Sequence, residues 1–248
     1  MAGFFFCIKV VKYRIIVDLW SVYMKYLSVF DIIGPVMVGP SSSHTAGAVR
    51  IGLITRTIFG ERPDFVKFTL YNSFAKTGKG HGTDKGLVGG LLGFRVDDER
   101  IKDAYKFAES NKIKIFFDYK YDSERHPNSV DIELAKFDSG HNMVIKGNSL
   151  GAGSIQISSI DGIEVDIRGD YHTLLLVYKD QPGMIWKVSK CIQDYGINIA
   201  YLSCGRSEKG QKATMSIFLD GILSNEATKD LYQIPDMYLI RTVEKLEK

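Results

Sequence analysis

Cysteine is scarce in this chain: 248 residues contain only Cys7, Cys191 and Cys204. Three scattered cysteines are too few for a disulfide framework or a structural zinc site. They are also too few to ligate an iron–sulfur cluster, which is usually held by four thiolates. Free thiols are typical of reducing compartments, so the composition predicts a cytoplasmic protein.

Long apolar runs and a strong excess of one charge are also missing. Lysine and arginine outnumber aspartate and glutamate by only three, and no arginine-rich run exists, so a nucleic-acid partner is not expected. No stretch reaches the roughly 20 apolar residues of a membrane-spanning helix. Residues 1–23 are largely apolar, but charges interrupt them and no signal-peptide order is present. We interpret them as an extension from an upstream start, with Met24 opening the working protein.

Two glycine motifs of nucleotide sites are absent as well. No G-x-G-x-x-G follows a predicted strand, and residues 77–83 lack the spacing G-x-x-x-x-G-K-[ST]. Neither a dinucleotide-binding unit nor a phosphate-binding P-loop is therefore predicted.

The stretch that stands out is Gly39-Pro40-Ser41-Ser42-Ser43-His44-Thr45. A turn before a helix exposes backbone N–H groups, which favour an anion such as a carboxylate. The serines add hydroxyl donors, and His44 adds an imidazole that titrates near neutral pH. An ordinary helix N-cap followed by a solvent-facing histidine would explain the same residues.

The first part of the chain alternates helices and strands. Apolar spacing predicts helices at Thr45–Phe59, Lys85–Gly93 and Asp98–Asn111, with Thr83 or Asp84 capping the second. Leu27–Ile33 is a short apolar segment, and Lys76–Asp84 is predicted as a glycine-rich loop. Predicted strands, with a turn at Gly147–Gly153 between two of them, are Asp64–Tyr71, Ile113–Tyr119, Ser129–Phe137, Asn142–Lys146, Ser154–Ser158 and Gly162–Asp166.

After residue 170 the pattern restarts in the order βαββαβ, which is the ferredoxin-like module. The predicted strands are Thr173–Tyr178, Ile197–Cys204, Ala213–Leu219 and Met237–Thr242. The predicted helices follow Pro182-Gly183, with Ile185, Val188, Ile192 and Tyr195 facing the core, and span Glu226–Tyr232. The fold class is therefore α+β, with an N-terminal mixed domain at 24–168 and a C-terminal domain at 171–248.

Several spaced motifs together resemble one family. They are Ser28–Gly34, Gly39–Thr45, Lys76–Asp84, His126-Pro127-Asn128 and Gly147–Gly153, in that order. From Met24 to the C-terminus the chain resembles the β subunit of the bacterial iron–sulfur-dependent L-serine dehydratase. Residues after 170, with their Asp180-Gln181-Pro182-Gly183 loop and Asn198, look like an ACT domain, a module that commonly senses amino acids.

The resemblance implies an enzyme that deaminates L-serine to pyruvate and ammonia without pyridoxal phosphate. It also implies a [4Fe–4S] cluster ligated by a separate α subunit, so this chain would be half of an enzyme. L-serine would be the substrate and could also be an effector, and ACT–ACT dimerisation could occur. No membrane partner is expected.

On this basis His44 is expected to be the general acid/base, with Ser43 beside it in the catalytic set. Ser41, Ser42 and Thr45 are expected to hold substrate. Lys79, His81 and Thr83 would form a second carboxylate-binding loop, either at the active site or at an allosteric pocket, although a loop that merely packs against the α subunit explains that segment equally well.

Other polar residues carry weaker expectations. Gly183 could offer N–H groups to an amino-acid carboxylate, and Asn198 could meet the ammonium; the alternative is a purely structural dimerisation module. His126 and Asn128 fit either a rigid turn or ligand contact. Cys191 and Cys204 are interpreted as core residues of the ACT pattern. No role is assigned to His141 or His172.

A different class of function competes with the enzyme subunit. The chain could be a non-catalytic, amino-acid-sensing regulatory subunit of a partner enzyme, since its arrangement looks similar to the regulatory end of some phosphoglycerate dehydrogenases. The Ser-Ser-Ser-His loop favours the enzyme subunit, because a sensor needs no base.

Overall fold

The computed structural model describes residues 35–246 of the chain. These residues belong to one compact unit, Gly34–Lys248. The Ser28–Gly34 motif, the Leu27–Ile33 segment and the extension at residues 1–23 lie outside the described residues. No helix in the described range is long and apolar enough to cross a bilayer.

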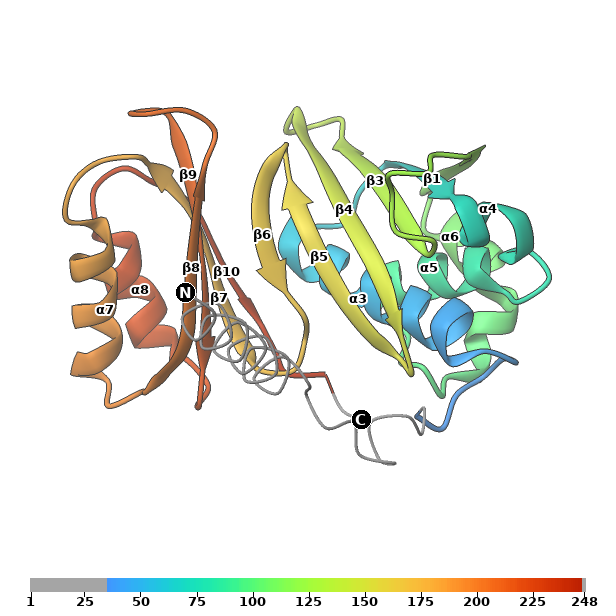
Figure 1. Cartoon of the computed structure of the whole chain (residues 1–248), viewed down its shortest axis with the longest axis horizontal. Helices are drawn as coiled ribbons and strands as arrows, with labels where there is room; N and C mark the ends of the chain where they lie inside the picture. The colour runs from blue at the N-terminus through green and yellow to red at the C-terminus, as the bar shows by residue number, and fades with distance from the viewer. Residues whose placement is uncertain (1–34, 247–248) are drawn as a thin grey trace, which may run out of the picture. The chain divides into compact units, whose positions relative to one another are not determined.

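A six-stranded sheet organises the first part of the described chain, in the order β2-β1-β3-β4-β5-β6 (Figure 1). β1 and β2 are parallel, and every other neighbouring pair is antiparallel. The strands are β1 (Phe65–Tyr71), β2 (Lys114–Lys120), β3 (Ser129–Lys136), β4 (His141–Gly151), β5 (Ser154–Ile160) and β6 (Ile163–Ile167). All five strands predicted between residues 113 and 167, and the one at 64–71, are confirmed.

Helices pack against one face of this sheet. They are η1 (Ser42–Ala46, a π-helical turn), α3 (Gly47–Phe59), α4 (Asn72–Thr77), α5 (Thr83–Leu91), η2 (Glu99–Asp103, a 3₁₀ turn) and α6 (Ala104–Ser110). Alternate residues of the central strands point into the core beneath them, as the two-residue strand period requires. Fully buried examples are Phe68, Leu70, Ile132 and Ile145.

Helices α3 and α5 approach each other unusually closely because glycines line their contact. A Cβ on Gly52 would lie 2.4 Å from the Leu87 carbonyl oxygen, and one on Gly90 would lie 2.0 Å from the Val49 carbonyl oxygen. A Cβ on Gly86 would lie 3.0 Å from the Thr45 carbonyl oxygen. This packing holds the start of α5, and the loop before it, beside the turn that carries His44.

The second sheet has the order β10-β7-β9-β8, with all neighbours antiparallel. Its elements are β7 (His172–Lys179), α7 (Met184–Asp194), β8 (Ile199–Arg206), β9 (Lys212–Leu219), α8 (Asn225–Tyr232) and β10 (Met237–Val243). The predicted ferredoxin-like βαββαβ order is confirmed. Its own core includes Leu176, Val188, Ile217 and Leu231, which are all fully buried.

Four local predictions are wrong. The Lys76–Asp84 segment is not one loop, because Lys76 and Thr77 end the unpredicted helix α4. Neither Thr83 nor Asp84 caps α5: its N-cap is Gly82, with a left-handed backbone and no side-chain hydrogen bond. Gly147–Gly151 extends β4, and positive φ angles begin only at Gly151. In the helix predicted after Gly183, Ile185 and Tyr195 are exposed, and Met184 is buried instead.

Candidate active site

The serine-rich segment forms the N-terminal turn of the helix that continues as α3. Ser41 is the N-cap, and its Oγ accepts a hydrogen bond from the His44 backbone N–H at 3.1 Å. The next turn is π-helical, a form often found at functional sites, and continues directly into α3. Gly39 is required before it, since its φ is +125° and a Cβ there would lie 2.6 Å from the Thr45 side chain. The turn thus fixes where the His44 ring emerges.

Both ring nitrogens of His44 face hydroxyl groups. Nδ1 lies 3.2 Å from Ser43 Oγ, while Nε2 lies 3.0 Å from Thr77 Oγ1 and 3.3 Å from Ser73 Oγ. The Thr77 hydroxyl already donates its only proton to the Ser73 carbonyl oxygen at 2.9 Å. Thr77 therefore accepts from His44, which puts the proton of the neutral ring on Nε2. Nδ1 is left as an acceptor for the Ser43 hydroxyl.

The surroundings favour the neutral form of His44. Its pKa is lowered mainly because the ring is partly buried, and secondly because of the neighbouring His81. Hydrogen bonding to the Ser73 backbone opposes these effects. The Phe74 ring contacts the imidazole edge-on, with centroids 5.3 Å apart. A neutral imidazole with a defined tautomer is the state that a general base needs.

His81 lies next to His44, with ring centroids 5.1 Å apart. Its Nδ1 donates to the Thr77 carbonyl oxygen at 2.9 Å, which leaves Nε2 as the acceptor nitrogen of the neutral ring. The Thr45 hydroxyl donates to the His81 carbonyl oxygen at 2.8 Å. The structure therefore brings together two imidazoles, each with its tautomer set by neighbouring groups.

Two further motifs noted in the sequence, Gly147–Gly153 and His126-Pro127-Asn128, contact the segments around His44. Ser149, on β4, donates its hydroxyl proton to the Ser43 carbonyl oxygen at 2.7 Å. The Pro127 carbonyl oxygen accepts from the Ser73 backbone N–H at 2.8 Å, and the Asn128 carbonyl oxygen accepts from Ser149 N–H at 2.9 Å. Of the five motifs noted in the sequence, the four that fall within the described residues converge around His44.

The remaining predicted substrate residues differ in accessibility. Ser41, Ser42 and Ser43 are half-buried at the N-terminal turn, and Lys79 is exposed in the turn before His81. Thr45 is buried, and its hydroxyl proton is already donated to the backbone of His81. Thr83 is fully buried, and its hydroxyl finds no hydrogen-bond partner within the described structure. Lys79 and the three serines are therefore better placed than the two threonines to meet a ligand.

The sequence did not single out Ser73, Thr77 or Ser149 as functional. Ser73 and Thr77 are four residues apart, so they share one face of α4. That helix was not predicted, which is why the pair was missed. Ser149 lies within a noted motif, but the interpretation of that motif as a turn concealed its strand position.

The predicted ACT ligand residues lie apart in this chain. Gly183 follows the end of β7, whose Lys179 pairs with Lys212, whereas Asn198 precedes Ile199, which pairs with Leu219 at the other end of β9. The length of the strands puts the two positions roughly 20 Å apart. Gly183 lines a surface pocket with Asp180, Trp186, Cys204 and Arg206. One small amino acid could not contact both Gly183 and Asn198 within a single copy.

The two cysteines in the described part of the chain do not form a metal site. Cys191 is half-buried beside the Ala227 carbonyl oxygen, but Cys204 is exposed, so its interpretation as a core residue is wrong. The reason is that β8 is an edge strand, whose side chains the helices cover only in part. Among residues 35–246 no group of three or more His, Cys, Asp or Glu could hold a metal ion.

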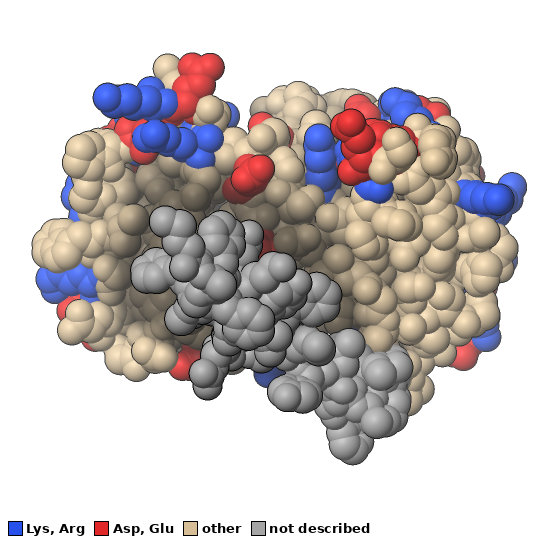
Figure 2. All heavy atoms as spheres, in the orientation of Figure 1, with Lys and Arg blue, Asp and Glu red and all other residues tan. Residues whose placement is uncertain are grey.

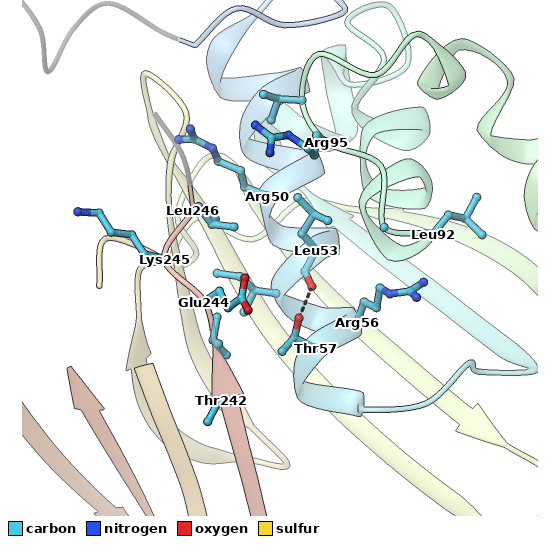
Figure 3. Close-up of a pocket in the computed structure, with 14 residues that line it drawn as sticks. Arg50, Leu53, Arg56, Thr57, Leu92, Arg95, Thr242, Glu244, Lys245 and Leu246 are labelled. Atoms are coloured by element: carbon cyan, nitrogen blue, oxygen red, sulfur yellow. Dashed lines mark hydrogen bonds between the residues drawn. The ribbon is translucent and has the colours of Figure 1, made fainter. Parts of the chain in front are cut away.

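A separate cavity of about 570 Å³ lies between α3 and the residues after β10 (Figure 3). Its lining includes Arg50, Arg95, Glu244 and Lys245. Arg50 comes from α3 and donates to the Gly153 carbonyl oxygen at 2.7 Å. The cavity contains none of the predicted site residues, so its size does not make it the candidate active site.

Comparison with known proteins gives consistent matches. The family model described as serine dehydratase beta chain matches residues 28–159, and the ACT domain model matches residues 172–236. The chain is 40% identical over 220 residues to the probable L-serine dehydratase beta chain of Bacillus subtilis, covering 89% of this chain and 99% of that protein.

Two other relatives extend the comparison. The L-serine dehydratase beta chain of Peptoniphilus asaccharolyticus is 40% identical over 198 residues, covering 79% of this chain and 89% of that protein. A D-3-phosphoglycerate dehydrogenase of Bacillus subtilis is 30% identical over 89 residues, which is only 17% of that protein. The similarity to the dehydratase chains therefore runs through nearly the whole chain, and the similarity to the dehydrogenase does not.

Proposed function

The chain belongs to the serine dehydratase beta-chain family, and on that premise we propose that it is one subunit of an L-serine ammonia-lyase. The observation that carries the proposal is the His44–His81 pair, two imidazoles 5.1 Å apart with tautomers set by neighbouring hydroxyl and carbonyl groups. A subunit with a purely sensing role would have no use for such an arrangement.

The proposed reaction removes a proton from Cα of L-serine and hydroxide from Cβ. The released enamine takes up water and yields pyruvate and ammonia, so the atoms of serine are conserved. One group must accept the Cα proton and another must protonate the leaving hydroxide. His44 is the proposed base, since its pKa is lowered and its Nδ1 faces the Ser43 hydroxyl, which can relay the proton. His81, with Nε2 directed away from its Thr77 contact, is the proposed second group; in this role Nε2 carries a proton and gives it to the leaving hydroxide, which departs as water.

The hydroxyl-rich N-terminal turn supports binding of the substrate carboxylate. Ser41, Ser42 and Ser43 lie at the first turn before α3, where backbone N–H groups and the helix dipole favour an anion. Lys79 is exposed in the turn before His81 and supplies a positive charge nearby. We assign these groups to substrate orientation.

A [4Fe–4S] cluster is expected from the resemblance, but residues 35–246 of this chain do not fit one. Cys191 and Cys204 lie on α7 and β8 of the ACT domain, and the His44 site contains no cysteine. We therefore assign the cluster to the α subunit and attribute to this chain only binding and proton transfer. The face drawn at the right of Figure 2, over α3 to α5, carries few charged side chains, which suits a protein contact.

The test is anaerobic formation of pyruvate from L-serine, measured for this chain alone, for the α subunit alone and for the pair. We expect activity only in the pair. In the pair, His81→Asn should lower kcat at least tenfold, because Asn can still donate to the Thr77 carbonyl oxygen but cannot transfer a proton to the leaving hydroxide. Lys187→Ala, at a half-buried position on α7 of the ACT domain, is the control and should leave kcat unchanged.

Two outcomes would contradict the proposal. If the pair formed no pyruvate while the chain still bound an amino acid, the regulatory alternative would stand. If His81→Asn were fully active, His81 would have no part in proton transfer.

For the ACT domain we propose an amino-acid site shared by two copies. β8 is an edge strand, and antiparallel pairing of two β8 strands about a two-fold axis would bring one copy's Asn198 to the Arg206 end of the other. Asn198 Nδ2 donates to Asp220 Oδ2 at 2.7 Å, which leaves its Oδ1 for the ligand ammonium. Gly183, at the start of α7, would meet the carboxylate.

Calorimetric titration with L-serine tests this arrangement, together with sedimentation of the chain. We expect serine to increase the dimer fraction, because the ligand bridges two copies, and Asn198→Ala to weaken binding about tenfold. Asn225→Ala, at the start of α8, serves as a control. Serine binding with unchanged affinity to a strictly monomeric chain would contradict the shared site.

A further inference from the structure

Asn72 has an unusual backbone at the junction between β1 and α4. Its φ is +52°, in the left-handed region that glycine adopts most readily and asparagine and aspartate more often than other residues. Tyr71 before it is still extended, with φ −119° and ψ 148°. The chain therefore turns from strand to helix within a single residue. Strained backbone of this kind persists where the surrounding structure holds it, and often does so near functional sites.

The Asn72 side chain binds the loop before β3 through both of its polar atoms. Its Nδ2 donates to the Asp122 carbonyl oxygen at 2.7 Å and to the Arg125 carbonyl oxygen at 3.2 Å. Its Oδ1 accepts from the Asp122 backbone N–H at 2.9 Å. Asn72 is therefore fixed in both backbone and side chain.

The same loop is itself anchored to the sheet and caps α4. Arg125 forms an ion pair with Asp131 on β3 and stacks on the Tyr71 ring, 4.2 Å from its centroid. The Tyr71 hydroxyl donates to Asp131 Oδ2 at 3.0 Å. The Pro127 carbonyl oxygen accepts from the first N–H groups of α4, those of Ser73 and Phe74, at 2.8 and 3.3 Å. This explains the His126-Pro127-Asn128 motif as a cap for α4.

Helix α4 in turn supplies the contacts that hold both imidazoles. Ser73 and Thr77 face His44 Nε2, and the Thr77 carbonyl oxygen accepts from His81 Nδ1. The helix spans only six residues, Asn72–Thr77, and has no side-chain N-cap. A helix so short is not stable on its own, so its direction comes from its surroundings: from the buried side chain of Phe74 and from the turn that precedes it.

We propose that Asn72 is a positioning residue: its left-handed backbone, braced by residues 122–127, aims α4 so that Ser73 and Thr77 set the tautomers of His44 and His81. The expected effect of Asn72 on kcat rests on the proposed function of the two histidines. The expected effect on which ring nitrogens carry the protons does not rest on it, and it can be measured in the absence of any reaction.

Three variants separate the backbone from the side chain. Asn72→Val replaces Asn with a β-branched residue that cannot adopt this φ, whereas Asn72→Gly adopts it freely but loses the side-chain bonds. Lys112→Val is the matched control, because Lys112 also has a positive φ, +59°, and lies in the turn before β2 without contact to α4. All three are made in the full chain.

The first measurement is ¹⁵N NMR of the histidine rings in the folded chain. In the wild type we expect His44 to show one protonated and one acceptor nitrogen, with the proton on Nε2. In Asn72→Val we expect the proton to exchange between Nδ1 and Nε2 of His44, so that the signals of the two nitrogens average. In Asn72→Gly and Lys112→Val the two signals should stay distinct. If Asn72→Val does not fold, Asn72→Ala is used in its place, because alanine is less strained than valine at this φ.

The second measurement is kinetic, on the pair with the α subunit. Asn72→Val should lower kcat at least tenfold with KM within threefold, and Asn72→Gly should retain at least a third of kcat. Lys112→Val should lower the melting temperature but not kcat. A folded Asn72→Val with wild-type ring signals, or equal changes in Lys112→Val, would overturn the positioning role. A fully active His44→Ala would overturn the proposed function instead, and the ring signals would still decide on Asn72.

Discussion

Replacing His44 by alanine in the pair with the α subunit is expected to lower kcat by about 10²–10⁴, the range for loss of a general acid or base. The reason is that the imidazole combines a lowered pKa with a defined tautomer whose acceptor nitrogen faces the Ser43 hydroxyl. The measurement is anaerobic pyruvate formation at saturating serine. An unchanged kcat would remove His44 from proton transfer.

A second histidine provides the control for this experiment. His141 stacks on Phe59, with ring centroids 4.5 Å apart, and its Nδ1 lies 2.8 Å from Glu61 Oε1. It has no contact with the His44 cluster, so His141→Ala should change stability but leave kcat within about twofold. Equal losses in both variants would indicate a general structural defect.

The pH dependence follows from the direction of the His44 pKa. Burial first, and His81 second, lower this pKa from its ordinary value of 6.5. A base works when unprotonated, so the acid limb of kcat/KM, where activity is lost as His44 becomes protonated, should be centred below pH 6.5. An acid limb centred above pH 6.5 would contradict the assignment of His44 as the base.

The largest effect on stability is expected from Gly90→Ala. The added Cβ would lie 2.0 Å from the Val49 carbonyl oxygen, a backbone atom that cannot move without separating α3 from α5. Overpacking of this kind costs about 3 kcal/mol, which exceeds the gain of about 1 kcal/mol from the better helix propensity of alanine. Urea unfolding of the full chain, followed by circular dichroism, measures the difference.

The adjacent Gly89 is the matched control on the same helix. A Cβ there would lie 3.1 Å from Ile101 Cγ1, a side-chain atom that can shift. Gly89→Ala should therefore change the free energy of unfolding by less than about 1 kcal/mol, because the small clash and the helix propensity nearly cancel. Equal stability of the two variants would show that α3 and α5 can separate without cost.

Much of the secondary structure follows from patterns within single segments. The helix at Thr45–Phe59 and the strand at Asp64–Tyr71 have clear apolar periods, and the structure contains both. The βαββαβ order after residue 170 was likewise readable from strand and turn signals. Short elements without a period of their own were not readable: α4 has six residues and only Phe74 is fully buried.

Predictions that depended on which strand lies beside a segment failed for a different reason. Gly147–Gly151 looks like a turn by composition, yet it pairs with β3 and β5 as a strand. Cys204 looks like a core residue by pattern, yet it lies on an edge strand where one side is open. Local sequence does not encode which strands lie at an edge or which segments find a partner.

The sequence by itself determined the family, the fold class and the residue types of the candidate site, because motif spacing and apolar periodicity are local properties. It also singled out His44 and His81. Only the tertiary structure decided that the two rings adjoin, that Ser73 and Thr77 select the protonated nitrogen of His44, and that Asn72 aims the helix carrying them. Those relations join segments about 30 to 50 residues apart, and only close packing of α3, α4 and α5 beside the sheet brings them within hydrogen-bond distance.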